Sequence, residues 1–260
     1  MMDDKLMNDT RSVWERLAAF WDDSLKEGND FQKRLIMPAT DRLLGVVQGQ
    51  TILDACCGNG NYARVLASRG ATVVAFDGAP TFIERARQRT SPDLSITYTV
   101  MDATDHAALL ELGINRFDAV VCSMALMDLP TIEPLFQATR KLLKPTGRFV
   151  FSVCHPAFNS PRHIHTAELI SDNGKTQQRF GVKTEYYLTE YETLSEGLLH
   201  QPEPHPIFHR PISGIFNRAF EAGFVVDGFE EPSFPYEKSA NAFSFAKRPE
   251  IPPALVVRLR

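Results

Sequence analysis

The chain is poor in cysteine, and no two of its cysteines form a CxxC pair. The four are Cys56, Cys57, Cys122 and Cys154. The first two are adjacent, and the other two lie in apolar, strand-like runs. We therefore expect four buried free thiols in a reducing compartment, which indicates a cytoplasmic protein.

A long apolar run and an excess of positive charge are also absent. The longest nearly apolar run, Ala119 to Met127, is too short to span a bilayer, and the start, Met1 to Lys5, lacks the basic-then-apolar layout of a signal peptide. The formal net charge is -4. Because no basic excess is available to hold a phosphate backbone, neither nucleic acid nor a membrane is expected as a partner. The sequence does not indicate an oligomeric state.

The length and composition fit one globular domain. A chain of 260 residues suffices for a well-cored α/β domain with an extra lid, whereas two full domains would be tight. With 43% hydrophobic and 23% charged residues, the chain is neither disordered nor fibrous. Apolar residues at helical spacing predict helices over residues 10–26 and 30–46, separated at Gly28-Asn29.

From Thr51 onward, short apolar strands alternate with helices. The predicted strands cover residues 51–54, 72–77, 95–101, 117–123, 148–154, 224–229 and 254–259. One predicted helix follows a glycine-containing turn and ends at about Arg69. A second begins at Pro80, and two more cover residues 132–143 and 212–222. Such alternation predicts a parallel, doubly wound sheet whose strand ends meet at one ligand crevice. Residues 155–210, rich in Pro, His and Tyr, break this rhythm and are expected to form an insertion over the strand ends.

A glycine-containing turn follows the first predicted strand, beginning at Asp54. Gly58 and Gly60 let the backbone approach a ligand where a Cβ atom would clash, and the next helix begins with unpaired N–H groups facing the crevice. Alone, this turn also fits the loose dinucleotide-binding pattern, with Ala63 in the last position, or a tight turn without a ligand.

Two further carboxylates follow the next two strands. Asp77 ends the second strand, where it can accept hydrogen bonds from both ribose hydroxyls, and Asp102 ends the third, where it can accept from an adenine amine. Each residue alone could equally be a helix N-cap or a turn residue. Acidic residues at three successive strand ends, all facing one crevice, favour a nucleotide-like ligand.

With these residues the sequence resembles the class I S-adenosylmethionine-dependent methyltransferases. In that family an acidic residue and a Gly-x-Gly-x-Gly motif cradle the methionine end of the cofactor. Here Asp54 leads the motif, Cys56 takes the place of the first glycine, and Gly58 and Gly60 match the other two. The resemblance implies S-adenosylmethionine as cofactor and S-adenosylhomocysteine as product. It also implies further cofactor contacts at Asp77, Gly78, Asp102, Ala103, Ser123 and Met124.

The resemblance covers about Gln50 to Arg260 and implies an α/β fold. The expected sheet is Rossmann-like, doubly wound and seven-stranded, mostly parallel with a C-terminal antiparallel strand hairpin, an ending not expected of a nicotinamide dehydrogenase. The expected parts are an N-terminal helical cap (1–48), a cofactor-binding core (49–154), an inserted substrate lid (155–210) and the C-terminal part of the core (211–260). In the cap, Arg34 and Trp21 are candidates for binding the cofactor carboxylate.

The resemblance is closest to the small-molecule branch of the family, which includes the ubiquinone and menaquinone C-methyltransferases and related methyltransferase type 11 proteins. Many members carry His-Pro after the fifth strand, a Tyr-rich stretch with Ser-Glu-Gly, and His-Arg before the late helix. The matching residues here are His155-Pro156, Ser195-Glu196-Gly197 and His209-Arg210.

Six of the seven histidines lie between residues 155 and 209. His205 and His209 have zinc-like spacing, but the surrounding prolines prevent a helix that would present both rings on one face, so no metal is predicted. His163, His165, His200 and His205 are interpreted as solvated loop residues. His155, which directly follows the fifth strand, is expected to point into the crevice.

His155 and His209 are therefore the catalytic candidates, to orient the acceptor or remove its proton, although His155 could equally be a structural cap of its strand. Tyr187, Tyr191 and Arg210 join them as substrate-binding candidates. The predicted reaction transfers a methyl group to an oxygen, nitrogen or carbon of a small, apolar or aromatic metabolite. The alternatives are an NAD-type oxidoreductase and a non-catalytic S-adenosylmethionine-binding protein.

Overall fold

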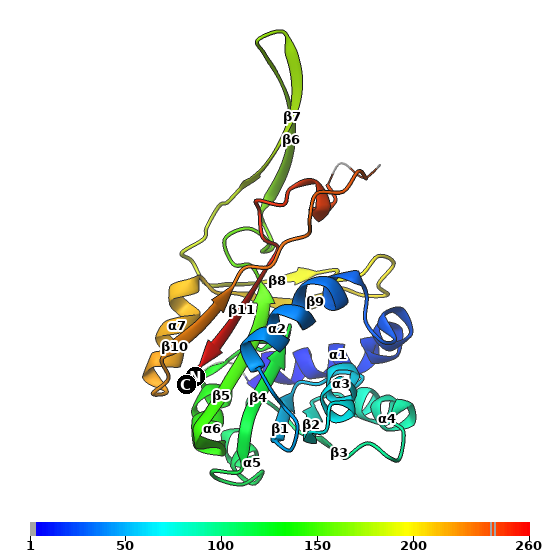
Figure 1. Ribbon diagram of the computed structural model, residues 1–260, viewed down its shortest axis with the longest axis vertical. Coiled ribbons are helices and arrows are strands. Elements are labelled where there is room, and N and C mark those ends of the chain that lie inside the picture. The colour runs from blue at the N-terminus through cyan, green and yellow to red at the C-terminus, as the bar shows by residue number, and fades with distance from the viewer. Residues whose placement is uncertain (1–3, 240, 242) are drawn as a thin grey trace.

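A seven-stranded sheet forms the centre of the computed structural model, which describes residues 4–239, 241 and 243–260. Its strands are β1 (Thr51–Ala55), β2 (Thr72–Asp77), β3 (Ile96–Val100), β4 (Phe117–Ser123), β5 (Leu143–Cys154), β10 (Val226–Glu230) and β11 (Ala254–Leu259). They lie in the order β10-β11-β5-β4-β1-β2-β3 (Figure 1). The five from β1 to β5 pair in parallel, and β11 runs antiparallel to both β5 and β10. The predicted Rossmann-like sheet with an antiparallel ending is confirmed.

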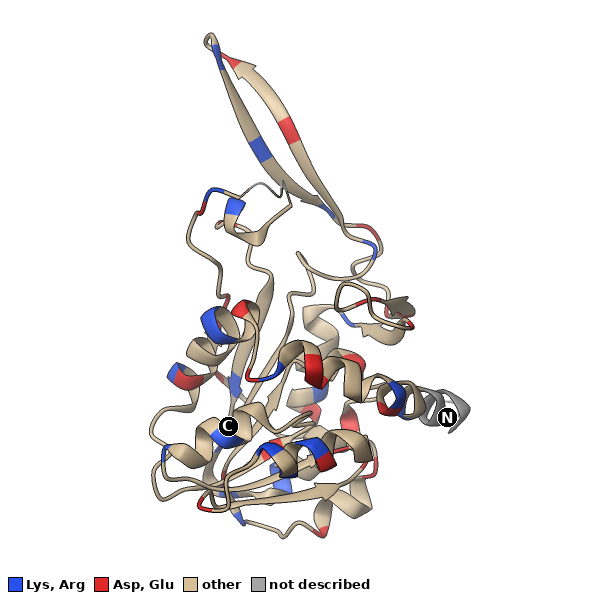
Figure 2. Ribbon diagram, turned by 90° about the vertical axis from the view of Figure 1, so that its right-hand side faces the viewer, with Lys and Arg blue, Asp and Glu red and all other residues tan. Residues whose placement is uncertain are grey.

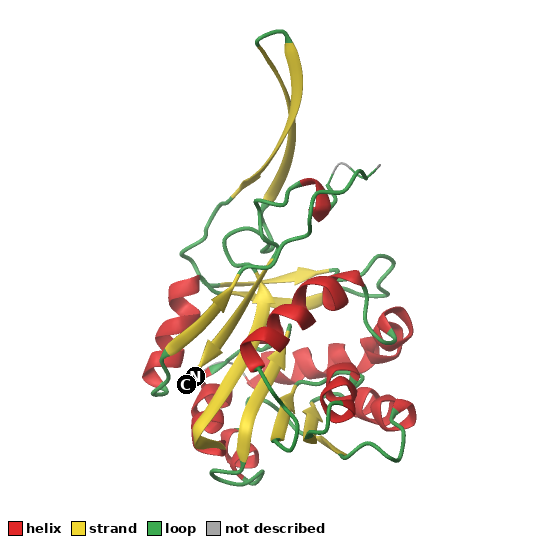
Figure 3. Cartoon of the chain, viewed as in Figure 1, coloured by secondary structure: helices red, strands yellow, loops and turns green. Residues whose placement is uncertain are grey.

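Helices cover both faces of this sheet (Figure 3). The helices and helical turns of the described residues are α1 (Asp4–Leu25), the π-helical turn η1 (Gln32–Ile36), α2 (Met37–Leu44), α3 (Asn61–Ser68), α4 (Pro80–Arg89), α5 (His106–Leu110), η2 (Leu126–Asp128), α6 (Glu133–Leu142), α7 (Ile212–Glu221) and η3 (Phe245–Lys247), of which η3 lies away from the sheet. Among the described residues, no helix has the length and apolarity needed to cross a membrane.

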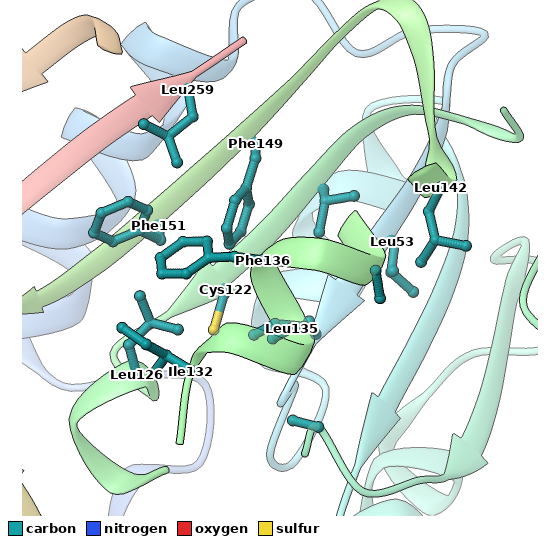
Figure 4. Packing of buried hydrophobic residues seen from close by; sticks show 14 of the residues in the cluster. Leu53, Cys122, Leu126, Ile132, Leu135, Phe136, Leu142, Phe149, Phe151 and Leu259 are labelled. Carbon is teal, nitrogen blue, oxygen red and sulfur yellow. The ribbon is translucent and has the colours of Figure 1, made fainter. Parts of the chain in front are cut away.

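The continuous apolar run of β4 is explained by burial on both faces. Val120 and Cys122 pack with the core on the α6 and α7 side, whereas Ala119 and Val121 pack with the core on the α2 and α3 side. Successive side chains alternate between faces, so the middle of the strand, residues 119–122, is covered on both sides and is apolar throughout. On the first side, the rings of Phe136, Phe149 and Phe151 meet at centroid distances of 5.7–6.0 Å (Figure 4).

The inserted segment contains two antiparallel strand pairs that the sequence did not predict. Strands β6 (Ile164–Asp172) and β7 (Lys175–Lys183) form a long hairpin that projects from the body (Figure 1). Its turn is Asn173-Gly174, and both residues have positive φ, the combination that a two-residue hairpin turn requires. Strands β8 (Tyr191–Ser195) and β9 (His205–His209) pair beside the end of the sheet. Residues 185–190, where polar and apolar side chains alternate in part, form a loop with a turn, and β8 begins directly after them at Tyr191.

The structure also differs from the prediction in one helix and in one strand boundary. Helix α5 was not predicted; its N-cap is Asp105, whose side chain accepts a hydrogen bond from the backbone N–H of Ala108. Strand β5 begins at Leu143 rather than Arg148. Its first part includes Pro145 and Gly147, where the pairing with β4 is irregular. The predicted 1–48 cap corresponds to α1, η1 and α2, and its residues 1–3 lie outside the described part of the chain.

Candidate active site

A cavity of about 620 Å³ lies where the carboxyl ends of the parallel strands meet α1 and the inserted segment. We call the walls contributed by the loops after β1, β2 and β3 the glycine-turn half. The walls contributed by Trp14 and Trp21 of α1, Asp128 after β4, and Gly197 and His205 of the inserted segment are the insertion half. All ten cofactor-binding candidates line this cavity except Gly60.

Two glycines shape the turn after β1 in different ways. Gly58 has φ +53, and nothing lies within 4 Å of where its Cβ would be, so its backbone faces open space in the cavity. At Gly60, with φ +72, a Cβ atom would lie 2.4 Å from the hydroxyl of Tyr98. Gly60 therefore seats the turn against β3, and its contribution to the cavity is indirect. Cys56 holds φ +56 despite its side chain.

Asp77 fixes the geometry of this turn. Its carboxylate accepts hydrogen bonds from the backbone N–H groups of Gly58 and Ala79, each at 2.9 Å. Burial raises the pKa of Asp77, and the two N–H groups oppose the rise. The side chain that ends β2 thus joins two loops and still lines the cavity.

Asp102 joins the end of β3 to the N-terminal helix. Oδ1 accepts from the backbone N–H and the hydroxyl of Thr104, at 2.8 and 2.7 Å. Oδ2 accepts from a guanidinium nitrogen of Arg11 in α1, at 3.2 Å. Arg11 also lines the cavity, so α1 closes over the end of β3.

Asp54 is a buried carboxyl group in the site whose charged form is disfavoured. It is 1% exposed, and its Oδ2 has no hydrogen-bond partner within the described part of the chain. Burial raises the pKa of Asp54 to about 7, and the nearby Asp77 carboxylate adds to the rise. A buried, unpartnered carboxylate oxygen on a cavity wall suits a cationic ligand group such as an ammonium.

Aromatic rings dominate the insertion half. The ring of His205 lies 4.7 Å from that of Trp14 and 5.9 Å from that of Trp21, between centroids. Gly197 permits this packing, because a Cβ atom there would lie 2.7 Å from the Trp21 ring. The result is an aromatic wall built from α1 and the inserted segment together.

His205 was predicted to be a solvated loop residue, and that prediction is wrong. It is 3% exposed and lines the cavity, and burial lowers its pKa to about 4. Its Nε2 lies 3.8 Å from Oδ1 of Asp128. Burial, with repulsion from Asp77, raises the pKa of Asp128 well above its ordinary value. Sequence reasoning missed Asp128, although an acidic residue just after an apolar strand was a usable signal.

His155 does not point into the crevice as predicted. It is buried but does not line the cavity. Nε2 lies 2.8 Å from Oε1 of Glu231, and Nδ1 accepts from the backbone N–H of Ala157. Both ring nitrogens are therefore used to tie the end of β5 to neighbouring loops.

His209, Tyr187, Tyr191 and Arg210 support the insertion rather than line the large cavity. Nε2 of His209 donates to the carbonyl of Tyr187 at 2.8 Å, Nδ1 lies 2.6 Å from the hydroxyl of Ser160, and the ring stacks on Tyr191. Arg210 is buried and donates to three carbonyls of the loop that carries Asp128, those of Leu126, Leu129 and Pro130.

The remaining candidates fall in different places. His200 is exposed as predicted, whereas His163 and His165 are half-buried and hydrogen-bonded. Trp21 lines the cavity, but Arg34 does not; it pairs with Asp30 and Glu237. Among the described residues, no group of three His, Cys, Asp or Glu side chains lies together in a way that could hold a metal ion.

Comparison with known proteins identifies the family. A family model described as a methyltransferase domain matches residues 53–151. A 2-phytyl-1,4-naphtoquinone methyltransferase of Trichormus variabilis is 30% identical over 191 residues, which cover 70% of this chain and 80% of that protein. The chain belongs to the class I S-adenosylmethionine-dependent methyltransferases.

Two further similarities, one to a curated protein and one to a solved structure, are also to methyltransferases. A demethylmenaquinone methyltransferase of Tropheryma whipplei is 28% identical over 59% of this chain, which spans only 61% of that relative. A solved S-adenosylmethionine-dependent methyltransferase of Mesorhizobium loti is 27% identical, with a TM-score of 0.63 over 86% of this chain and 96% of that one. The protein is an enzyme, its cofactor is S-adenosylmethionine, and nothing in these comparisons supports the oxidoreductase alternative.

Proposed function

We propose that this methyltransferase acts on a small, apolar, aromatic acceptor that carries an ionisable hydroxyl, and that Asp128 takes the acceptor's proton. The observation that carries the proposal is the insertion half, where two tryptophans and His205 form an aromatic wall and Nε2 of His205 lies 3.8 Å from Oδ1 of Asp128 in the same cavity. Relatives named for naphthoquinone, demethylmenaquinone and ubiquinone biosynthesis support an acceptor of this class.

The glycine-turn half would hold the cofactor. Asp77 would accept hydrogen bonds from the ribose hydroxyls and Asp102 from the adenine amine, while the free oxygen of Asp54 would face the ammonium. The backbone after β4, at Ser123 and Met124, would contact the methionine portion. When bound, the cofactor supplies an electrophilic methyl group on its sulfonium sulfur.

The chain's own chemistry then consists of alignment, exclusion of water and removal of one proton. A carboxyl group with a raised pKa is an effective base close to neutral pH. The acceptor hydroxyl would give its proton to Asp128, and its oxygen would form the new bond to the methyl group as the bond from that methyl to the cofactor sulfur breaks. For methylation at a ring carbon, the carbon would form that bond instead and then lose its own proton, while the oxygen regains one. The proton then passes from Asp128 to solvent.

The helical cap (1–48) and the inserted lid (155–210) would keep water out of this reaction. Support comes from Asp22 of α1, which is 1% exposed and bonded to Arg85 and Arg89 of α4 and to Asn59 of the glycine turn. Lys and Arg residues alternate with Asp and Glu residues along the ribbon (Figure 2), and the net charge is -4, which supports a small molecule rather than a nucleic acid as acceptor. The four free cysteines support a cytoplasmic location.

The test is methyl transfer by Asp128→Asn from labelled S-adenosylmethionine to a panel of hydroxylated naphthalenes and quinols. Loss of the base predicts a fall in kcat of about 100-fold to 10,000-fold. S-adenosylhomocysteine affinity, measured by calorimetry, should be unchanged. The exposed His200→Gln variant, from the same inserted segment as His205, is the matched control and should turn over normally. Wild-type turnover by a folded Asp128→Asn protein would overturn the proposal.

A further inference from the structure

Gln201 is a buried amide at the junction of the cap, the insertion and the aromatic wall. It is 7% exposed and makes four hydrogen bonds. Its Oε1 accepts from the indole N–H of Trp21 at 3.1 Å and from the backbone N–H of Gly197 at 3.2 Å. Its Nε2 donates to the carbonyl of Glu203 at 2.6 Å and lies 3.1 Å from Nδ1 of His205.

These partners leave only one orientation for the amide. The indole of Trp21 and the backbone N–H of Gly197 can only donate, so the amide oxygen must face them. The carbonyl of Glu203 can only accept, so the NH₂ group must face it. The same NH₂ group faces His205, and reversing the amide would break three of the four bonds.

The orientation of the amide determines the tautomer of His205. Because the NH₂ group donates to Nδ1, that nitrogen carries a lone pair and no proton. The ring is neutral near pH 7, since burial lowers its pKa. The single ring proton therefore sits on Nε2, the nitrogen that faces Asp128 at 3.8 Å. Two uncharged indoles and Gly197 also pack against the ring, and the Arg16–Glu203 ion pair lies at the nearby surface.

We infer that Gln201 is a positioning residue that fixes His205 as the Nε2–H tautomer and so keeps a donor directed at Asp128. This inference rests on the proposed function of Asp128 as the base. The same amide also accepts from Trp21 of α1, so the selection of the tautomer depends on α1 being seated on the inserted segment. The packing of α1 on the inserted segment and the direction of the Nε2–H donor towards Asp128 thereby depend on the same side chain.

The direct test is the tautomer itself, read from long-range ¹H–¹⁵N correlations of protein labelled in its histidines, with His205 assigned by its loss in His205→Gln. The wild-type enzyme at pH 7 should show a protonated Nε2 and an unprotonated Nδ1. In Gln201→Glu the new carboxylate accepts where the amide donated, so the ring proton should move to Nδ1. Exposed His200 should be unchanged in both proteins.

Kinetics complete the test. Gln201→Glu should lower kcat about tenfold or more, because it weakens proton removal, with S-adenosylhomocysteine affinity unchanged. Gln201→Met, of similar volume and without a donor, should give a mixture of tautomers and a smaller loss. Should His205 keep the Nε2 proton in a folded Gln201→Glu protein, the inference is overturned while the proposed function stands. Full activity in Asp128→Asn would instead overturn the proposed function, and the positioning role of Gln201 with it.

Discussion

The two halves of the cavity are held together by different kinds of contact. In the glycine-turn half, the carboxylates of Asp77 and Asp102 are fixed by N–H groups at their own strand ends and at the adjacent turn. In the insertion half, His205 is held by Trp14, Trp21 and Gln201, which lie in α1 and in the loop before β9. Contacts at and between neighbouring strand ends dominate the first half, with Arg11 of α1 as a distant partner of Asp102. The second half depends on packing between α1 and the inserted segment, and we propose that it sets the acceptor.

Two buried aspartates differ in whether the fold supplies partners for their charge. Asp22 and Asp54 are each 1% exposed. Burial alone would raise the pKa of Asp22, but hydrogen bonds from Arg89, Arg85 and Asn59 outweigh it and lower the pKa to about 2. Among the described residues, Asp54 has no arginine partner and only a backbone hydrogen bond from Ala63 to oppose burial, so its pKa is raised to about 7. Asp22 therefore stabilises the fold, whereas the charge of Asp54 is left for a ligand to neutralise.

Removing the carboxylate that holds α1 against α4 should have the largest effect on the free energy of unfolding. Asp22→Asn removes the carboxylate that pairs with Arg85 and Arg89, and should lower the free energy of unfolding by about 3 kcal/mol. The adjacent Asp23→Asn, whose side chain is 68% exposed, should cost no more than about 0.5 kcal/mol. Urea denaturation of the two variants checks this, and equal losses would contradict the assignment.

The cofactor contact can be tested in the other half. Asp77→Ala should weaken S-adenosylhomocysteine binding by about 1.5–3 kcal/mol, the range for hydrogen bonds to a charged group. Calorimetry gives the affinity, and the exposed Asp93→Ala variant is the control. Undiminished affinity in a folded Asp77→Ala protein would remove Asp77 from the cofactor site.

Removing the charge of Asp54 should raise stability and lower affinity together. A folded-state pKa above the unfolded one means that this carboxyl destabilises the fold as pH rises from about 4 past 7. At pH 8, Asp54→Asn should therefore raise the free energy of unfolding of the ligand-free enzyme by about 1–3 kcal/mol while weakening cofactor binding. A less stable variant at pH 8 would show that the carboxylate has a partner in the fold.

The last predicted effect is a change in the pH dependence of stability, which is confined to acidic pH and absent at neutral pH. His205 has a folded-state pKa of about 4, below its ordinary 6.5, so its contribution is complete above pH 6.5 and is lost as pH falls towards 4. The contribution to the slope approaches about 1.4 kcal/mol per pH unit in that interval. Comparing His205→Gln with wild type isolates it from Asp54, which acts with the opposite sign. Parallel curves for the two proteins would contradict the burial of a neutral ring.

The sequence predicted what is encoded locally. The strands of the sheet, the glycine turn and the carboxylates at its strand ends each follow from a few consecutive residues. The hairpin of β6 and β7 was missed although Asn173-Gly174 signalled its turn. The role of His205 could not be predicted, because its burial depends on tryptophans of α1 far away in the sequence. His155 and His209 were chosen for their places in the chain, but their ring nitrogens are bonded to neighbouring loops.

We propose that the glycine-turn half binds the cofactor and that the insertion half carries out the chemistry. The most direct measurement is a crossed one, in which kcat and S-adenosylhomocysteine affinity are determined for both Asp77→Ala and Asp128→Asn. The account predicts that Asp77→Ala loses affinity by at least about tenfold and retains most of its kcat at saturating cofactor, whereas Asp128→Asn keeps its affinity and loses kcat by at least about 100-fold. If both variants lost affinity and rate in the same proportion, the two halves would not have separate roles, and the account would be contradicted.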